Sequence, residues 1–125
     1  MKNVLVVDDS AVVRAQIRVT LEDCGYSVIE AVDGFDGVAQ IGSEKNIDLV
    51  ICDINMPRMD GLGLIEKVRG NADERIASLP IVVLSTVGDP ERVRKARRLG
   101  AQGWLVKPFL PEFLIKTVAK LTEAA

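Results

Sequence analysis

The chain of 125 residues, 48% of them hydrophobic, has the length of one domain and too much apolar character for a disordered protein. Its net charge of −2 argues against direct nucleic-acid binding, and no apolar stretch approaches the ~18 residues that span a membrane. Because the first residues lead at once into an apolar run, we expect no signal peptide and a cytoplasmic protein.

Five apolar runs alternate with five helical patterns, which is typical of an α/β protein with a parallel sheet covered by helices. The predicted strands are residues 3–7, 26–31, 47–52, 80–85 and 103–107. All of them except 26–31 lack polar alternation, as expected for strands that are covered on both faces. We therefore expect 26–31 at an edge of the sheet.

The predicted helices cover about 11–24, 35–44, 61–70, a segment that begins at Pro90, and 111–123. In the first helix, apolar residues recur on one face as far as Cys24, and Gly25 ends the helix. The segment 71–78, rich in Asn, Asp and Ser, is predicted to be a loop. No repeat or linker interrupts the pattern, so residues 1–125 are expected to form a single domain.

The helix that begins at Pro90 is strongly basic. Asp89 is its predicted N-cap, and proline suits the first helical position. Its apolar stripe is thin and consists of Val93, Ala96 and Leu99. The remaining positions form a basic face of Arg92, Arg94, Lys95, Arg97 and Arg98. Such a face either is simply solvated or binds an acidic partner.

Acidic, hydroxyl and ammonium groups stand where four of the predicted strands end. They are Asp8 and Asp9, Asp53, Ser85 and Lys107. Because parallel strands finish at one edge of a sheet, we expect these groups to meet in one pocket. Taken singly, the Asp pair could cap a helix and the lysine could lie along the sheet end, but their shared position favours a common site.

Three carboxylates about 5 Å apart repel pairwise by ~3 kcal/mol at an effective dielectric constant near 20. Either the pKa of one rises or a cation neutralises the cluster. Oxygen ligands and open positions suit Mg²⁺, and Mn²⁺ would be tolerated. The turn that follows Asp53 would also let the backbone carbonyl of Asn55 point toward the acids, unless it is a plain turn.

The hydroxyl and the ammonium suit a phosphoryl group. The sequence has no histidine, so Ser85 lacks an obvious base and is a poor nucleophile. Ser85, with Thr86 beside it, is better suited to donate to a phosphoryl oxygen. The ammonium of Lys107 is expected to pair with Asp53 and, once Asp53 is phosphorylated, to hold a phosphoryl oxygen.

With these residues the chain resembles the response-regulator receiver family, most closely its CheY-like stand-alone kind. The resemblance rests on Val6-Val-Asp-Asp9, Asp53-x-x-Met56-Pro57-x-Met59-Asp60-Gly61, Leu84-Ser85 and Lys107-Pro108-Phe109, which occur in family order. It covers the whole chain. It implies a doubly wound (βα)5 fold of the flavodoxin/CheY type with strand order 2-1-3-4-5.

The resemblance also implies a two-component response regulator that is not an enzyme acting on a separate substrate. Asp53 would accept a phosphoryl group from the phosphohistidine of a sensor histidine kinase or a phosphotransfer protein, in a Mg²⁺-dependent reaction. The implied metal ligands are Asp8, Asp9, Asp53 and the carbonyl of Asn55. The implied phosphoryl-binding residues are Ser85, Thr86 and Lys107.

The resemblance further implies a switch. Trp104 stands at the position of the family's switch aromatic and would turn inward when Ser85 moves toward the phosphoryl group; the alternative is a tryptophan that simply packs on the surface. The switching surface would bind a downstream effector protein in chemotaxis or a phosphorelay, as a monomer or a phosphorylation-dependent dimer. The expected contact residues are Arg92, Lys95, Arg98 and Trp104.

Several other interpretations remain open at this point. The chain could be the receiver part of a longer DNA-binding or enzymatic regulator, or a receiver that is not phosphorylated. A haloacid-dehalogenase-type phosphatase is disfavoured by the order of the residues. Such an enzyme has its nucleophile before its paired acids and a second Asp where this chain has Asn55. A flavodoxin-type carrier is disfavoured because Asp8 and Asp9 would repel the phosphate of FMN.

Overall fold

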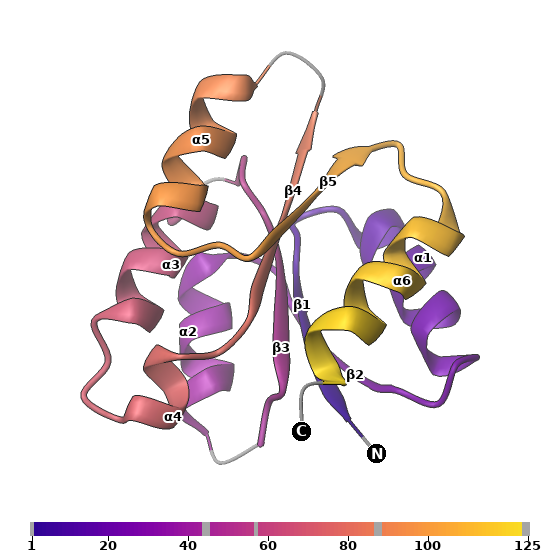
Figure 1. The fold of residues 1–125 in the computed structure, drawn as a ribbon, viewed down its shortest axis with the longest axis horizontal. Coiled ribbons are helices and arrows are strands. Elements are labelled where there is room, and N and C mark those ends of the chain that lie inside the picture. Colours follow the sequence, from indigo (N-terminus) through magenta and orange to yellow (C-terminus); the bar gives the residue numbers. More distant parts are fainter. Residues whose placement is uncertain (1, 44–45, 57, 87–88, 124–125) are drawn as a thin grey trace.

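The computed structural model describes residues 2–43, 46–56, 58–86 and 89–123. Five parallel strands form one sheet in the order β2-β1-β3-β4-β5 (Figure 1). Their bounds are β1 Asn3–Val7, β2 Ser27–Ala31, β3 Leu49–Asp53, β4 Ile81–Thr86 and β5 Gly103–Lys107. The predicted strand order is confirmed, as is the position of the second strand at an edge.

Helices cover both faces of the sheet (Figure 1). One layer consists of α1 Ala11–Glu22 and α6 Pro111–Thr122; the other consists of α2 Gly34–Gly42, α3 Gly61–Arg69, α4 Glu74–Ala77 and α5 Pro90–Arg98. Strand residues alternate between two apolar cores, with Val4 and Val6 on the α1–α6 side and Leu5 and Val7 on the other. Covering both faces explains the unbroken apolar runs. Among the described helices, none has both the length and the apolar sequence required to cross a bilayer.

The short helix α4 corrects the prediction of a loop over 71–78. Asp73 is its N-cap, and its carboxylate accepts a hydrogen bond of 3.0 Å from the backbone N–H of Arg75. Ile76 is buried in the core beside α3. A helix of four residues is too short to show a recurring apolar pattern, so only its loop-forming flanks are visible in the sequence.

Two helix ends also differ from the prediction. Helix α1 ends at Glu22, and Cys24 is an exposed residue beyond it. Helix α5 begins at Pro90 as predicted, but Asp89 makes no side-chain capping hydrogen bond. Its carboxylate instead accepts a hydrogen bond of 2.8 Å from Nδ2 of Asn55. A competing partner across the fold has thus replaced the local cap.

Candidate functional site

The ends of β1 and β3 bring three carboxylates together. Asp8 and Asp9 follow β1, Asp53 ends β3, and one oxygen from each carboxylate lies within 4.8 Å of the others. Asp8 and Asp53 are only 0% and 6% exposed, whereas Asp9 is exposed. This acid cluster offers the hard oxygen donors that divalent cations such as Mg²⁺ prefer.

The backbone around Asp8 holds its carboxylate in place. The backbone N–H of Ser10 donates to Asp8 Oδ1 at 2.8 Å, and the N–H of Asp8 donates to the carbonyl of Ala31 at 3.1 Å. The guanidinium of Arg14 donates to the carbonyl of Asp8. These bonds fix the first acid on the rigid sheet, and sequence reasoning did not identify the contribution of Arg14.

Lys107 links the two buried acids. Its Nζ lies 2.9 Å from Asp8 Oδ2 and 3.1 Å from Asp53 Oδ2, so the predicted pairing with Asp53 is confirmed. The lysine reaches the cluster from the end of β5, and the peptide bond that follows it, to Pro108, is cis. A cation that touches both carboxylates offsets part of their mutual repulsion.

Burial and charge shift the pKa values of this pair. Burial and the charge of Asp8 raise the pKa of Asp53, although the ammonium of Lys107 counteracts them. Burial alone would lower the pKa of Lys107, but the hydrogen bond to Asp8 and the charge of Asp53 outweigh it and raise the pKa. The lysine therefore stays charged, while Asp53 takes up a proton more readily than an ordinary aspartate.

Ser85 lies at the same edge of the sheet. It is 1% exposed, and its Oγ has no hydrogen-bond partner within the described part of the chain. A buried hydroxyl without a partner costs about 1–3 kcal/mol, which suits a group that binds a ligand oxygen. The next residue, Thr86, is exposed and pairs in register with Lys107.

The side chain of Asn55 points to α5. Its Nδ2 donates to Asp89, and its Oδ1 accepts from the guanidinium of Arg92. Arg92 also donates to the carboxylate of Asp60 and, at 3.0 Å, to the carbonyl of Ile54. These acceptors hold the guanidinium of Arg92, whose side chain is 33% exposed, so its predicted place in the partner surface stays a prediction. Sequence reasoning missed this cluster, since a helical face does not show which side chain a distant turn will engage.

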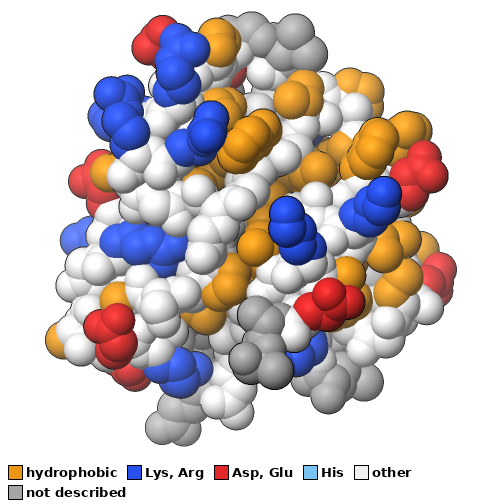
Figure 2. Space-filling view, viewed as in Figure 1, with side chains coloured by type: hydrophobic (Ala, Val, Ile, Leu, Met, Phe, Trp, Pro, Cys, Tyr) orange, Lys and Arg blue, Asp and Glu red, His pale blue; other side chains and the backbone are white. Residues whose placement is uncertain are grey.

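The other predicted partner-surface residues are exposed. Lys95 and Arg98 lie on the outer side of α5, and Trp104, 44% exposed, lies on β5. The guanidinium carbon of Arg97 is 4.5 Å from the centroid of the Trp104 ring. Figure 2 shows basic side chains over α5 and apolar side chains along the band between α5 and α6. These residues form a surface separate from the acid cluster.

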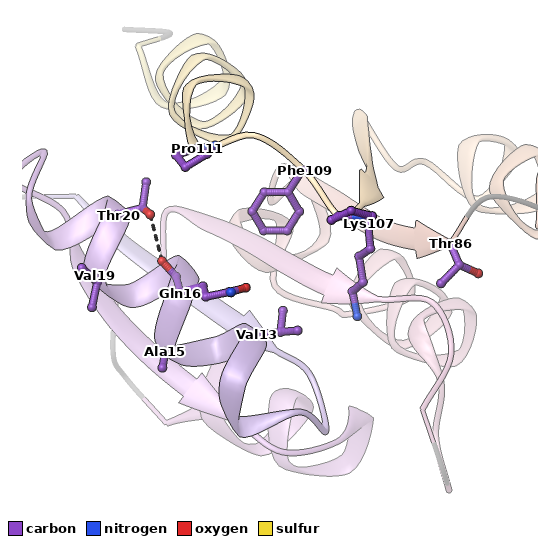
Figure 3. A pocket seen from close by; sticks show the side chains of 10 residues that line it. Val13, Ala15, Gln16, Val19, Thr20, Thr86, Lys107, Phe109 and Pro111 are labelled. Atoms are coloured by element: carbon purple, nitrogen blue, oxygen red, sulfur yellow. Dashed lines mark hydrogen bonds between the residues drawn. The ribbon is translucent and has the colours of Figure 1, made fainter.

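A mostly apolar groove of about 890 Å³ opens beside Lys107. It runs between α1 and the segment that joins β5 to α6, so that Phe109 and Lys107 face Val13 and Gln16 (Figure 3). Sequence reasoning missed the groove. The available signal was Val19, an apolar residue that does not belong to the predicted core-facing side of the first helix. In the structure Val19 is 60% exposed.

The motif residue Pro57 lies outside the described residues. Apart from Arg92, the described members of the predicted site divide into two groups. Asp8, Asp9, Asp53, Ser85 and Lys107 gather at the carboxyl ends of the strands, with Asn55 and Thr86 at the margin. Trp104, Lys95 and Arg98 lie on the separate outer surface.

Comparisons with known proteins agree with this architecture. Residues 4–119 match the family model described as "Response regulator receiver domain". The chain is 40% identical over 111 residues to chemotaxis protein CheY1 of Helicobacter pylori (strain J99), covering 88% of each. It is 40% identical over 120 residues to chemotaxis protein CheY of Treponema pallidum, covering 94% of this chain and 81% of that protein. The solved structure of chemotaxis response regulator CheY4 of Vibrio cholerae has a TM-score of 0.86 and 40% identity, covering 97% of this chain and 98% of that one.

Proposed function

Because the chain belongs to the response regulator receiver family, we propose that it is a two-component signalling protein whose phosphoacceptor is Asp53. The observation that carries the proposal is the bridge from Lys107 to the two buried carboxylates of the acid cluster. The partnerless hydroxyl of Ser85 at the same edge supports it. Together they would offer a phosphoryl group an acceptor, a cation and a hydrogen-bond donor.

We propose Mg²⁺ as the cation of this site, with Mn²⁺ tolerated. The ligands would be Asp8, Asp9, Asp53 and the backbone carbonyl of Asn55. Three carboxylates within 4.8 Å favour a divalent cation because it relieves their repulsion. When bound, the ion neutralises charge on the phosphoryl oxygens during transfer.

The protein groups then have distinct roles. A carboxylate oxygen of Asp53 attacks the phosphorus of a phosphohistidine; the new O–P bond forms as the P–N bond breaks, and the imidazole leaves with the electron pair. The ammonium of Lys107 and the hydroxyl of Ser85 hold the oxygens of the transferred phosphoryl group. Thr86, at the exposed end of β4, is the third proposed phosphoryl-binding residue. Since these 125 residues contain no histidine, the phosphohistidine lies outside them, and we propose a sensor histidine kinase or a phosphotransfer protein as the donor.

The groove beside Lys107 is our candidate for the donor's docking surface. A phosphohistidine must bring its phosphorus next to Asp53, and Lys107 lines the groove while it contacts Asp53 at 3.1 Å. The walls of the groove are mostly apolar, so a partner helix could bury apolar side chains there. Docking at this position would direct the donor imidazole toward the acid cluster.

We assign output to the surface of α5, β5 and α6. Lys95, Arg98 and Trp104 are among its exposed residues, and a downstream effector in chemotaxis or a phosphorelay is the proposed partner. Trp104 would change position when Ser85 moves toward the phosphoryl group. The same chemistry holds if the chain is the receiver part of a longer regulator.

Phosphorylation of Asp53 can be tested directly. With acetyl phosphate and Mg²⁺, the protein is expected to gain ~80 Da at Asp53, because the carboxylate forms an acyl phosphate. Intact-mass spectrometry followed by peptide mapping measures the adduct. Asp53→Asn is expected to abolish it, whereas Asp23→Asn, at the exposed C-cap residue of α1, should leave it unchanged. No adduct in the wild type, or an undiminished one in Asp53→Asn, would contradict the proposal.

Mg²⁺ affinity is expected to fall on acidification, beginning at a higher pH than the ordinary aspartate pKa of 3.8 implies. Because the pKa of Asp53 is raised, protons compete with the metal at pH values between the ordinary aspartate pKa and the raised one. Mg²⁺ affinity therefore rises with pH until Asp53 is ionised. Without metal, the folded state binds more protons than the unfolded chain there, so this group makes stability fall as pH rises. Calorimetric titration with Mg²⁺ at a series of pH values measures the change in affinity. Asp53→Asn should remove this pH dependence.

A further inference from the structure

We infer that Arg92 is a positioning residue that fastens the first turn of α5 to the turn between β3 and α3 and thereby transmits changes at the acid cluster to α5. This inference rests on the proposed function, because it takes the acid cluster to be the site that Mg²⁺ and a phosphoryl group occupy. Arg92 itself binds neither ligand in that proposal; it contacts the side chain of Asn55, whose backbone carbonyl is the proposed metal ligand.

The guanidinium of Arg92 holds a single turn by three acceptors. It donates to the carbonyl of Ile54 at 3.0 Å, to Oδ1 of Asn55 and to the carboxylate of Asp60. Ile54 and Asn55 directly follow Asp53, and Asp60 is the N-cap of α3. The planar fork of an arginine can satisfy acceptors in several directions at once, which the single ammonium of a lysine does not reproduce.

The amide of Asn55 is held at one end by α5 and at the other by the residue that precedes this helix. Arg92 donates to its Oδ1, and Asp89, three positions earlier, accepts from its Nδ2 at 2.8 Å. The backbone N–H of Asn55 donates to Asp53 Oδ1 at 3.3 Å. One residue therefore contacts the acid cluster through its backbone and α5 through its side chain. A shift of the Asp53 carboxylate therefore changes the position of the Asn55 amide, which is hydrogen-bonded to Arg92 of α5.

Helix α5 has few other anchors. Ala96 is its only buried residue among those described, and Val93 is only partly buried against the core. Because α5 buries so few apolar side chains, its position depends largely on the polar contacts at its first turn. At the other end, Arg97 stacks over Trp104. Trp104 is the only tryptophan of the chain, so its fluorescence reports on the position of α5.

A purely structural tie and a transmitting contact make different predictions. A structural tie would change the stability of the protein but leave the response of Trp104 to ligand intact. A transmitting contact separates occupancy of the site from the response, because ligand still binds when the connection to α5 is lost. The decisive measurement therefore compares binding and fluorescence in the same variants.

The probe is Mg²⁺ with beryllofluoride, a mimic of the phosphoryl group. Fluorine NMR measures the occupancy of the site, and Trp104 fluorescence measures the response. At equal occupancy, the fluorescence change of Arg92→Met and of Arg92→Lys is expected to be roughly fivefold smaller than that of the wild type. The matched control is Arg94→Met, which removes the same charge from an exposed arginine of α5 paired with Glu91. It should retain the full response.

A full response in Arg92→Met or Arg92→Lys at equal occupancy would overturn the inference and leave the proposed function standing. The lysine variant keeps the charge, so a normal response there would show that charge, and not the three-way contact, matters. An equal loss in Arg94→Met would also overturn it. Absence of bound fluorine in the wild type would refute the proposed function, and this inference with it.

Discussion

Replacing Lys107 by methionine is expected to lower the free energy of unfolding by about 3 kcal/mol in the absence of divalent cations. The lysine is the cation that contacts both Asp8, at 2.9 Å, and Asp53, at 3.1 Å. Its removal leaves two buried carboxylates beside each other without compensation. Part of the loss is relieved because the pKa of Asp53 rises further once the ammonium that lowers it is gone.

Urea denaturation measures this loss, and Mg²⁺ provides a second test. The ion is expected to stabilise Lys107→Met more than the wild type, because in the variant it does not compete with the ammonium. Lys120→Met, which removes the same charge from an exposed position on α6, serves as the control and should change stability by less than about 0.5 kcal/mol. Equal stabilities of Lys107→Met and Lys120→Met would contradict the central role of Lys107.

Replacing Gly61 by alanine is expected to destabilise the protein by about 2 kcal/mol or more. A Cβ at this position would lie 2.6 Å from the carbonyl oxygen of Asp53 and 2.9 Å from Cα of Ile54. Both are backbone atoms at the end of β3, so the clash cannot be relieved by a side-chain rotation. The turn that carries Asn55 must move instead, and phosphoryl acceptance at Asp53 should decrease together with stability.

Gly42→Ala is the matched control for this substitution. Gly42 ends α2, and apart from its chain neighbours and the backbone of its own helix, no described atom lies within 4 Å of the position that its Cβ would take. Alanine there is expected to be neutral or to stabilise by about 0.5 kcal/mol, since it restricts the unfolded chain. Thermal unfolding and the yield of the acyl phosphate compare the two variants. A Gly61→Ala protein as stable and as reactive as Gly42→Ala would contradict the close approach.

The local sequence was sufficient to place the strands and the groups at their ends. An unbroken apolar run such as 49–52 is typical of a strand covered on both faces, and the alternation of such runs with helical patterns favours a parallel sheet between helix layers. In that topology, Asp53 and Lys107 necessarily end on the same edge. The order of the strands did not follow from these local patterns; it came from the family resemblance, and the structure confirms it.

The tertiary structure alone decided the partners of Asp89 and Arg92 at the start of α5. Periodicity assigns Arg92 to a basic helical face and Asp89 to a cap, because it describes only neighbours within the helix. In the fold, both side chains instead form hydrogen bonds with a turn more than thirty residues earlier. Arg92 donates to Ile54 and Asp60, and Asp89 accepts from Asn55. Apolar burial follows from sequence periodicity, whereas the choice among polar partners depends on which acceptors the folded chain brings within reach.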